Sequence, residues 1–447
     1  MLGMLGLIAS LALLMFLTMK GVNIIIGAII SSLVVAITGG LNLETAMTDY
    51  YMTGFTGYFK NWFLIFLLGA IFGKVMEGTK AADSIAKWVT GKLGHSRAVF
   101  AVVAAAAIMT YGGVSLFVVG FSVYPIAVSL FRMANLPHRF IPAALVFGSI
   151  SFTMTAPGSP EIQNLIPTQF FGTKPTAGGL IGVLMALLIM TVGGWFLGRM
   201  VRKAAENGEV FSLPGKENKK ESEDASAAIA SEIKPSQEEN KALPPILLAI
   251  LPLISVIAIL NIMANFMSST AAALISLSGG IFLASLLMAK YLKAFWDALA
   301  KGAQDALVAA ANTCAVVGFG SVAAKVSSFD QVVDTLVNIP GPPYLGLAIA
   351  VTLICGITGS ASGGLGIALP ILAPIYMGQG LDPNAMHRIS ALASGGLDSL
   401  PHNGYVVTTI RAISGETHKR AYKPIFILSV VIPTIVMFLA VILYSIF

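Results

Sequence analysis

Asp398 and His402 are ionisable residues in a part of the chain where a charge is hard to place. They lie four residues apart within the apolar stretch 389–410. Asp398 is the only acid that we place well inside a predicted membrane span. An ionisable side chain at that depth indicates a proton relay or an ion ligand. The competing interpretation is structural: neighbouring hydroxyls would satisfy the carboxylate, and His402 would cap a helix end.

Glu161 is a third candidate, and it follows a run of helix-breaking residues in the first half of the chain. Two prolines and a glycine within 157–160 remove helical hydrogen bonds, which frees backbone carbonyl and N–H groups. The stretch 400–404, Leu-Pro-His-Asn-Gly, has the same character in the second half. We interpret both as interrupted membrane helices. A solvated position explains Glu161 almost as well as a functional one.

The composition indicates a membrane protein. Of 447 residues, 56% are hydrophobic and only 11% are charged. Several continuous apolar runs reach the roughly 20 residues that a helix needs to span a bilayer, whereas a barrel would show alternating runs. We therefore predict an all-α polytopic membrane protein. The net charge of +6 does not indicate nucleic-acid binding, and the two cysteines, both inside apolar runs, indicate neither a disulfide nor a metal site.

The apolar tracts set the predicted order of helices. They are 2–19, 21–39, 61–79, 97–134, 139–157, 176–198, 243–264, 269–289, 304–326, 344–378, 389–410 and 424–447. Two of them, 97–134 and 344–378, are too long for one span, and each contains a cluster of glycine and serine. We interpret each as a re-entrant hairpin with a broken tip, because irregular backbone at membrane depth is tolerated only inside protein or around a wet cavity.

A repeated motif relates the two halves of the chain. The pattern Asn-x-x-His-Arg occurs at 135–139 and again at 384–388, each time directly after a hairpin. We predict two inverted-topology repeats, residues 1–201 and 243–447, joined by the polar linker 202–242. Each repeat contains one hairpin and one interrupted helix, at about 139–165 in the first and about 389–410 in the second. Secondary transporters use this architecture, with binding near the middle of the membrane.

The positive charges set the predicted orientation. With both termini outside, most lysines and arginines fall in the cytoplasm together with the linker, which leaves Lys60, Lys174, Lys325 and Arg388 outside. We selected this orientation because it agrees with the positive-inside rule. Arg139 and Arg388 are expected at helix ends that face lipid headgroups. We expect no deeply buried lysine or arginine, so backbone N–H groups, hydroxyls, amides and His402 would have to recognise a carboxylate.

Missing motifs narrow the function classes. The chain has no phosphate-binding G-x-x-x-x-G-K-[ST] sequence, which argues against an ATP-driven pump on this chain alone. It also lacks the G-x-S-x-G turn of serine hydrolases. We predict a carrier without cofactor or metal, and not an enzyme. The alternatives from other classes are an ion channel and an integral-membrane Ser/His hydrolase.

Several stretches are similar to those of the gluconate permease family, within the ion transporter superfamily. They are Gly69–Glu77, the Tyr111-Gly112-Gly113 tip, Ala156–Pro167 and Ser399–Gly404. The similarity covers nearly the whole chain, and the last two stretches most resemble the branch for short hydroxy acids such as 3-hydroxybutyrate. The resemblance implies elevator-type, cation-coupled symport of a small organic anion across the cell inner membrane, usually driven by protons. Sodium coupling stays open, because related families bind sodium at such hairpin tips.

The resemblance also implies an assembly and a binding site. It implies a homodimer in the lipid membrane, with a scaffold and a moving transport domain. By position, one half-site contains Gly112, Gly113, Ser115, Thr155 and Asn164. The other half-site contains Ser360, Ser362, Gly363, Asp398, His402 and Asn403. Asp398, His402 and Glu161 remain the candidates for ion coupling.

Overall fold

The computed structural model describes residues 2–20, 22–93, 97–214, 243–292 and 294–447. These residues form helices joined by turns, and they include eight helices long and apolar enough to cross a membrane. The prediction of an all-α polytopic membrane protein is confirmed. Most of the predicted linker, residues 215–242, lies outside the described residues, and helix α10 continues through Glu206 before that segment.

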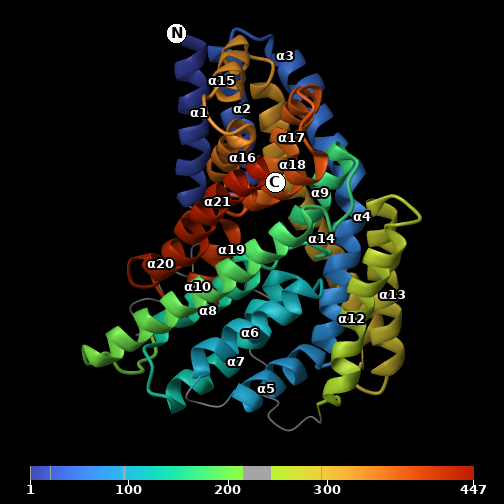
Figure 1. Cartoon of the computed structure of the whole chain (residues 1–447), viewed down its shortest axis with the longest axis vertical. Coiled ribbons are helices and arrows are strands. Elements are labelled where there is room, and N and C mark those ends of the chain that lie inside the picture. Colours follow the sequence, from blue (N-terminus) through green and yellow to red (C-terminus); the bar gives the residue numbers. More distant parts are fainter. Residues whose placement is uncertain (1, 21, 94–96, 215–242, 293) are drawn as a thin grey trace.

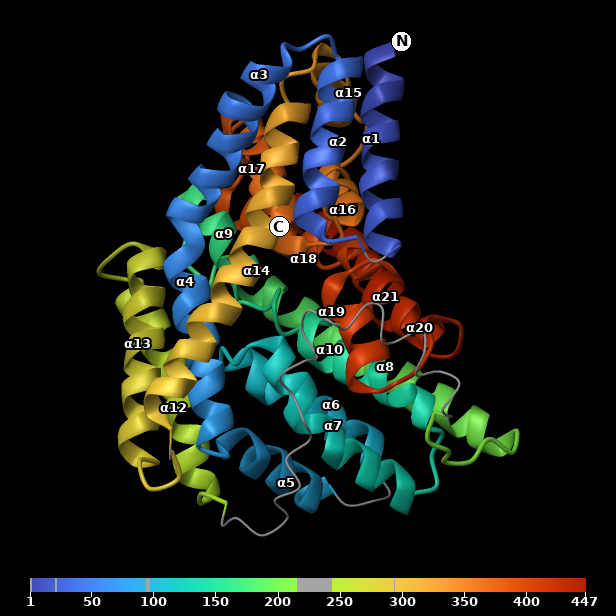
Figure 2. The ribbon, with the colours of Figure 1, turned by 180° about the vertical axis from the view of Figure 1, so that it is seen from behind.

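Two long helices, α4 and α14, pack along each other and run along much of the molecule (Figures 1 and 2). Small residues allow this close approach: a Cβ added at Gly54 would lie 2.1 Å from the Ser321 hydroxyl, and one added at Gly302 would lie 2.7 Å from the Ile71 Cα. Helix α4 (Met52–Gly78) continues from α3 (Leu43–Thr45) and the π-helix η1 (Ala46–Tyr51), and α14 covers Phe295–Ala323.

The predicted spans 61–79 and 304–326 were therefore too short at their N-terminal ends. Polar residues such as Lys60 and Asp305 break the apolar pattern there, but the helices continue because they are supported by each other. Tyr51 shows how: its ring is 4% exposed and lies against the backbone position of Gly318 in α14. Packing against a partner helix thus extends both helices beyond their apolar cores.

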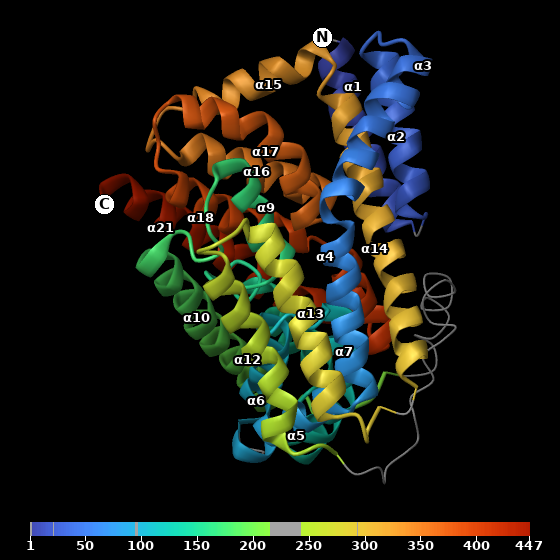
Figure 3. The ribbon, with the colours of Figure 1, turned by 90° about the vertical axis from the view of Figure 1, so that its right-hand side faces the viewer.

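Two helix pairs flank this central pair. Helices α1 and α2 pack together, with α2 against α14, and α12 and α13 pack together, with α13 against α4 (Figure 3). Their bounds are α1 Leu2–Met19, α2 Ile24–Thr38, α12 Ile246–Met263 and α13 Ser269–Leu287. Large apolar side chains such as Leu247 and Phe282 are exposed on the outside of these helices, as expected where a protein faces lipid.

Each long apolar tract folds as two helices joined by a short turn. The first pair is α6 and α7, preceded by α5, and the second is α16 and α17, preceded by α15. The two pairs lie toward opposite ends of the molecule (Figures 1 and 3). Their bounds are α5 Ala81–Leu93, α6 Ala98–Tyr111, α7 Leu116–Met133, α15 Ser327–Val337, α16 Leu345–Thr358 and α17 Ala361–Gly378.

An interrupted helix follows each pair. The first consists of η3 (His138–Phe140), α8 (Ile141–Val146), η4 (Phe147–Ser151), an irregular stretch and α9 (Ile162–Phe171). The second consists of α18 (Pro383–Ser394), η7 (Leu397–Ser399), α19 (Gly404–Val407) and η8 (Thr408–Ile413). It begins earlier than the predicted 389 because the Asp382 carboxylate caps α18, accepting hydrogen bonds from the backbone N–H groups of Asn384 and Ala385.

The two halves of the chain interlock through these interrupted helices. Helix α9 of the first half packs against α17 and α18 of the second, while α20 packs against α8 and α21 against α10. The remaining bounds are α10 Gly179–Glu206, α20 His418–Phe426, η9 Ile427–Val431 and α21 Ile432–Ile446. Segments from both halves therefore surround each interruption.

Candidate functional site

The tip of the second hairpin contacts the second interruption, the segment between α18 and α19. Gly359 ends α16 with a left-handed φ of +60°, and Ser360 caps α17 by accepting a hydrogen bond from the Gly363 N–H at 3.2 Å. A Cβ at Gly359 would lie 2.4 Å from the His402 ring, so only glycine lets the chain pass there. The Asn403 amide also donates to the Gly359 carbonyl at 3.1 Å. His402 and Asn403 thus contact the hairpin tip directly.

Asp398 is buried within the same interruption. It is 6% exposed, and its Oδ1 accepts a hydrogen bond from the Ser399 hydroxyl at 2.8 Å. The chain here is a 3₁₀ turn followed by an irregular stretch, so Asp398 and His402, four residues apart, do not lie on successive turns of one helix. Ser362 lies beside Ser360 with their hydroxyl oxygens 3.4 Å apart. The structure thus gathers the predicted residues of the second half-site around one tip.

The tip of the first hairpin likewise contacts the first interruption, the segment between η4 and α9. Gly112 ends α6, and Gly113 has a φ of +92°, the left-handed region that favours glycine. The Tyr111 hydroxyl donates to the Pro157 carbonyl at 2.8 Å, and a Cβ at Gly113 would lie 3.3 Å from the Pro160 ring. Ser115 begins α7 at the far side of this tip. Glu161 is half-buried at the end of the irregular stretch, and its N–H donates to the Ser159 hydroxyl at 3.2 Å.

Asn164 is the centre of a buried cluster that joins the two halves. Its Nδ2 donates to the carbonyls of Ser159 (2.8 Å) and Pro175 (2.9 Å). Its Oδ1 accepts a hydrogen bond from Arg388 Nη2 at 2.8 Å and lies 3.2 Å from His387 Nε2. The other His387 ring nitrogen lies 2.6 Å from the Thr173 hydroxyl. Every polar atom of the Asn164 side chain is therefore engaged within the protein.

Arg388 is one of the largest fully buried side chains in the described structure. Its guanidinium donates to the carbonyls of Thr155, Pro175 and Ala177 as well as to Asn164. The prediction that Arg388 faces lipid headgroups, and that no arginine lies deep in the protein, is wrong. Carbonyl groups in the loop after α9 turn inward and provide the acceptors that make this burial tolerable.

The first copy of the repeated motif forms a second cross-half cluster. His138 Nδ1 lies 2.8 Å from Glu416 Oε1, with both side chains fully buried, and its Nε2 lies 3.0 Å from the Tyr124 hydroxyl. Arg139 makes two hydrogen bonds of 2.7 Å to Glu209, which follows α10. The Arg139 guanidinium lowers the pKa of the Glu209 carboxyl, chiefly through these hydrogen bonds.

Thr155 is the point at which the first interrupted helix packs against the second. A Cβ at Gly395, within the second interruption, would lie 3.0 Å from the Thr155 methyl group. The Thr155 hydroxyl is buried and has no hydrogen-bond partner in the part of the chain that the structure describes. Four residues that organise these clusters were not among the predicted site residues: His138, His387, Arg388 and Glu416. The repeated motif contains three of them.

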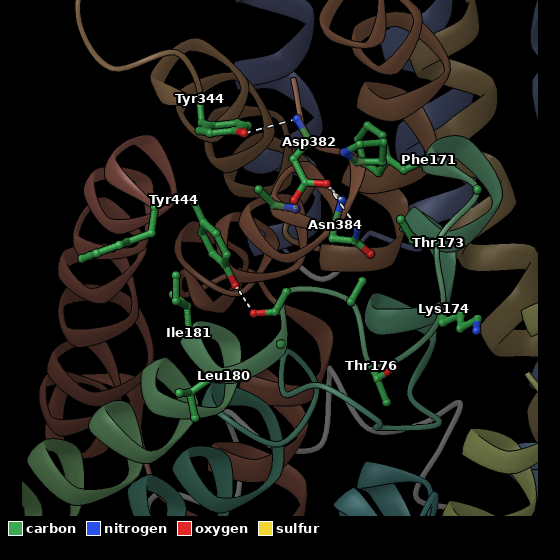
Figure 4. Close-up of a pocket in the computed structure, with 17 residues that line it drawn as sticks. Phe171, Thr173, Lys174, Thr176, Leu180, Ile181, Tyr344, Asp382, Asn384 and Tyr444 are labelled. Atoms are coloured by element: carbon green, nitrogen blue, oxygen red, sulfur yellow. Dashed lines mark hydrogen bonds between the residues drawn. The ribbon is translucent and has the colours of Figure 1, made fainter. Parts of the chain in front are cut away.

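A pocket lies beside the Arg388 cluster, and Thr173 and Ala177 belong to both. It has a volume of about 850 Å³ and is lined by the loop 171–181, the start of α18, Tyr344 and the end of α21. Figure 4 shows the Tyr444 hydroxyl bonded to the Gly178 carbonyl, at 2.6 Å, and Tyr344 beside the backbone of Asp382. None of the predicted site residues lines this pocket. Among the described residues, no group of three or more His, Cys, Asp or Glu side chains is placed to hold a metal ion.

Known proteins resemble this chain over nearly its full length. The family model for GntP family permeases matches residues 2–442. An uncharacterized transporter of Bacillus subtilis, YxjC, is 35% identical over 98% of this chain and 97% of its own. The crystal structure of the Alcanivorax borkumensis YdaH transporter, described as having an unusual topology, covers 100% of this chain and 98% of its own, with a TM-score of 0.55 and 14% identity.

A second solved structure has the same kind of fold. Neisseria gonorrhoeae MtrF, assigned to a class of antimetabolite efflux pumps, covers 91% of this chain and 84% of its own, with a TM-score of 0.50 and 14% identity. At that identity both structures support the fold alone. The family model and the Bacillus relative carry the assignment. This chain is a multi-pass membrane transporter, not an enzyme, and it belongs to the GntP permease family.

Proposed function

We propose that this transporter carries a small hydroxy-carboxylate or sugar acid, such as 3-hydroxybutyrate or gluconate, together with protons. The observation that carries the proposal is the buried Asp398, which lies in an interrupted helix whose His402 and Asn403 contact the second hairpin tip. A carboxylate there can bind a proton when the site faces one side of the membrane and release it when it faces the other. The tip backbone and neighbouring hydroxyls offer donors to a substrate carboxylate.

The same proposal includes the arrangement in the membrane. Residues 1–201 and 243–447 would form inverted repeats, with both termini outside and the linker 202–242 in the cytoplasm. The opposite placement of the two hairpins and the distribution of positive charge support this (Figure 3). Elevator-type movement, a homodimer and an inner-membrane location are further parts of the proposal, and they rest on the family resemblance.

Sodium-coupled carboxylate symport is the second candidate. The second tip holds the hydroxyl oxygens of Ser360 and Ser362 3.4 Å apart, and oxygen ligands of this kind suit a hard cation. Symport of either kind predicts stoichiometric, saturable uptake, which an ion channel does not give. The family assignment argues against the hydrolase alternative, because the family consists of permeases.

Uptake into proteoliposomes tests the proposal. Labelled 3-hydroxybutyrate and gluconate are offered first with an imposed proton gradient and then with a sodium gradient. We expect saturable accumulation of one acid under the proton gradient only. The variant Asp398→Asn should lose proton-driven accumulation by at least about tenfold while retaining exchange of substrate down its own gradient, since a neutral amide cannot carry the proton.

Accumulation under the sodium gradient alone would replace the proton assignment by the sodium one. Full proton-driven uptake by Asp398→Asn would show that another group couples the ion. If neither gradient drives either acid, the hydroxy-acid symport proposal is wrong.

A further inference from the structure

The charge of Arg388 is hydrogen-bonded but not neutralised. Its five hydrogen bonds within the described residues all go to carbonyl or amide oxygens, which are neutral acceptors. Among the described residues, none of the ion pairs within 4.0 Å includes Arg388. The nearby Asp382 carboxylate is engaged instead in capping α18. Arg388 therefore has no carboxylate within ion-pair distance among the described residues.

A buried charge without a counter-charge is costly. Removing an ion from water costs several kcal/mol even after the surroundings relax, and neutral acceptors recover only part of this cost. An arginine cannot relieve the cost by releasing its proton, because its guanidinium stays charged at any accessible pH. The charge persists because the surrounding fold holds it, and it favours any anion that can come near.

Thr155 connects the Arg388 guanidinium to a hydroxyl group that has no hydrogen-bond partner among the described residues. Its carbonyl accepts from Arg388, whereas its hydroxyl, in a residue that is 2% exposed, has no partner among the described residues. A buried hydroxyl without a partner is unfavourable, and beside the Arg388 guanidinium it leaves a donor available to an anion. The Thr155 methyl group packs against Gly395 of the second interruption.

A second unpaired hydroxyl lies on the other side of the same glycine pair. A Cβ at Gly396 would be 3.0 Å from the Thr434 hydroxyl, which also has no partner within the described ranges. Gly395 and Gly396 therefore each contact a threonine with an unpaired hydroxyl, Gly395 through the Thr155 methyl group and Gly396 at the Thr434 hydroxyl itself. Both hydroxyls can donate to an oxygen anion, and neither brings a competing negative charge.

We propose that Arg388 makes this junction selective for a carboxylate, which binds at the Thr155 hydroxyl and supplies the missing counter-charge. The inference rests on the proposed function and identifies the residues that recognise the substrate anion. The guanidinium nitrogens already donate to protein oxygens, so Arg388 does not bind the carboxylate directly. It acts as a positioning residue and attracts the carboxylate through the electrostatic field of its charge. Thr155 provides the direct hydrogen bond.

The chain contains its own control for this proposal. Arg139 occupies the same place in the first copy of the motif, but it makes a bidentate pair with Glu209 and is therefore neutralised. If an arginine in this motif only supported the fold, the two positions would behave alike. If the unpaired charge matters, only Arg388 should affect the choice of substrate.

The test measures competition between acids and their amides. Uptake of labelled 3-hydroxybutyrate by purified full-length protein in proteoliposomes is inhibited with unlabelled 3-hydroxybutyrate, gluconate and the corresponding neutral amides. Wild type should be inhibited by acids and hardly by amides. Arg388→Gln should weaken inhibition by the acids at least about tenfold and leave the amides unchanged, because it removes the charge. Arg139→Gln should keep the wild-type preference.

Two further variants separate charge from folding. Arg388→Lys keeps the charge with fewer hydrogen bonds, so it should keep the preference for acids at a lower maximal rate. Thr155→Val removes only the hydroxyl and should raise KM for the acid severalfold with little change in maximal rate. These two decide the question if Arg388→Gln does not yield a monodisperse protein.

Each outcome has a defined meaning. An unchanged acid preference in Arg388→Gln, an equal loss in Arg139→Gln, or an unchanged KM in Thr155→Val would overturn the inference while wild-type uptake of acids upholds the proposed function. Loss of the acid preference in Arg388→Lys, with its charge intact, would also overturn it. Absence of acid uptake in wild type would instead reject the proposed function, and the inference with it.

Discussion

The Asn-x-x-His-Arg motif occurs at residues 135–139, which we call the first corner, and at residues 384–388, the second corner. Its side chains have different partners at the two places. At the first corner His138 pairs with Glu416 and Arg139 with Glu209. At the second corner, among the described residues, the same two types of side chain face only hydroxyl, amide and carbonyl groups. The first corner is balanced by acids from elsewhere in the chain, whereas the second leaves its charge unbalanced. Local sequence sets the place of a cationic side chain, and its distant partners decide what its charge can do.

Both corners also connect the halves of the chain. His138 of the first half contacts Glu416 of the second, and His387 of the second contacts Asn164 of the first. Each histidine therefore lies near the start of one interrupted helix and contacts a residue in, or just after, the last segment of the other. Movement of one interrupted helix alone would break buried polar contacts, so we expect the two to move together.

The largest loss of stability is expected for Asn164→Leu, which removes hydrogen bonds at the second corner. The change removes an acceptor from Arg388 and His387 and two donors from the carbonyls of Ser159 and Pro175. Each orphaned buried group costs about 1–3 kcal/mol, and Arg388 cannot become neutral, so we expect a loss of about 3 kcal/mol or more. Denaturant titration in detergent micelles measures it.

Asn164→Asp is the matched control, since it keeps the acceptor oxygen and adds a counter-charge for Arg388. It should be clearly more stable than Asn164→Leu although it too loses both donors. Equal stability of the two variants would mean that the charge of Arg388 is already balanced, which would contradict the contrast between the corners.

A smaller effect is expected for Glu416→Gln at the first corner. The amide replaces the carboxylate without a change of shape, and it can still accept a hydrogen bond from the His138 ring at the position of Oε1. Because the hydrogen bond to His138 is kept, the loss should be about 1–2 kcal/mol in the same titration. A loss as large as that of Asn164→Leu would show that the first corner depends equally on charge.

The hairpin tips and interruptions could be predicted from the sequence because their causes are local. Gly359 and Gly113 have left-handed backbone that glycine adopts easily, and proline breaks helices wherever it falls. The repeated motif was also visible, so the two corners had a signal. These features depend on residue type and order alone.

The environment of Arg388 could not be predicted, because its causes are remote in sequence. A charged residue at the end of an apolar span normally faces headgroups, and this rule placed Arg388 outside. Its burial depends on carbonyls of Thr155, Pro175 and Ala177, more than 200 residues earlier, which turn inward around it. Likewise, nothing local to His138 indicates that Glu416 lies against it.

The smallest effect is expected for Arg139→Gln, the half-exposed counterpart of Arg388. Its partner Glu209 is 41% exposed, and solvent-exposed ion pairs contribute only about 0.2–1 kcal/mol, so the variant should lose no more than that at neutral pH. Since Arg139 lowers the folded-state pKa of Glu209, this contribution is present above the unfolded-state value of 4.5 and is lost as the pH falls through the lower folded value. The stabilities of variant and wild type should therefore converge in acid. A gap that persists there would show that Arg139 acts through its packing on Phe140, which lies 4.3 Å from the guanidinium, rather than through its charge.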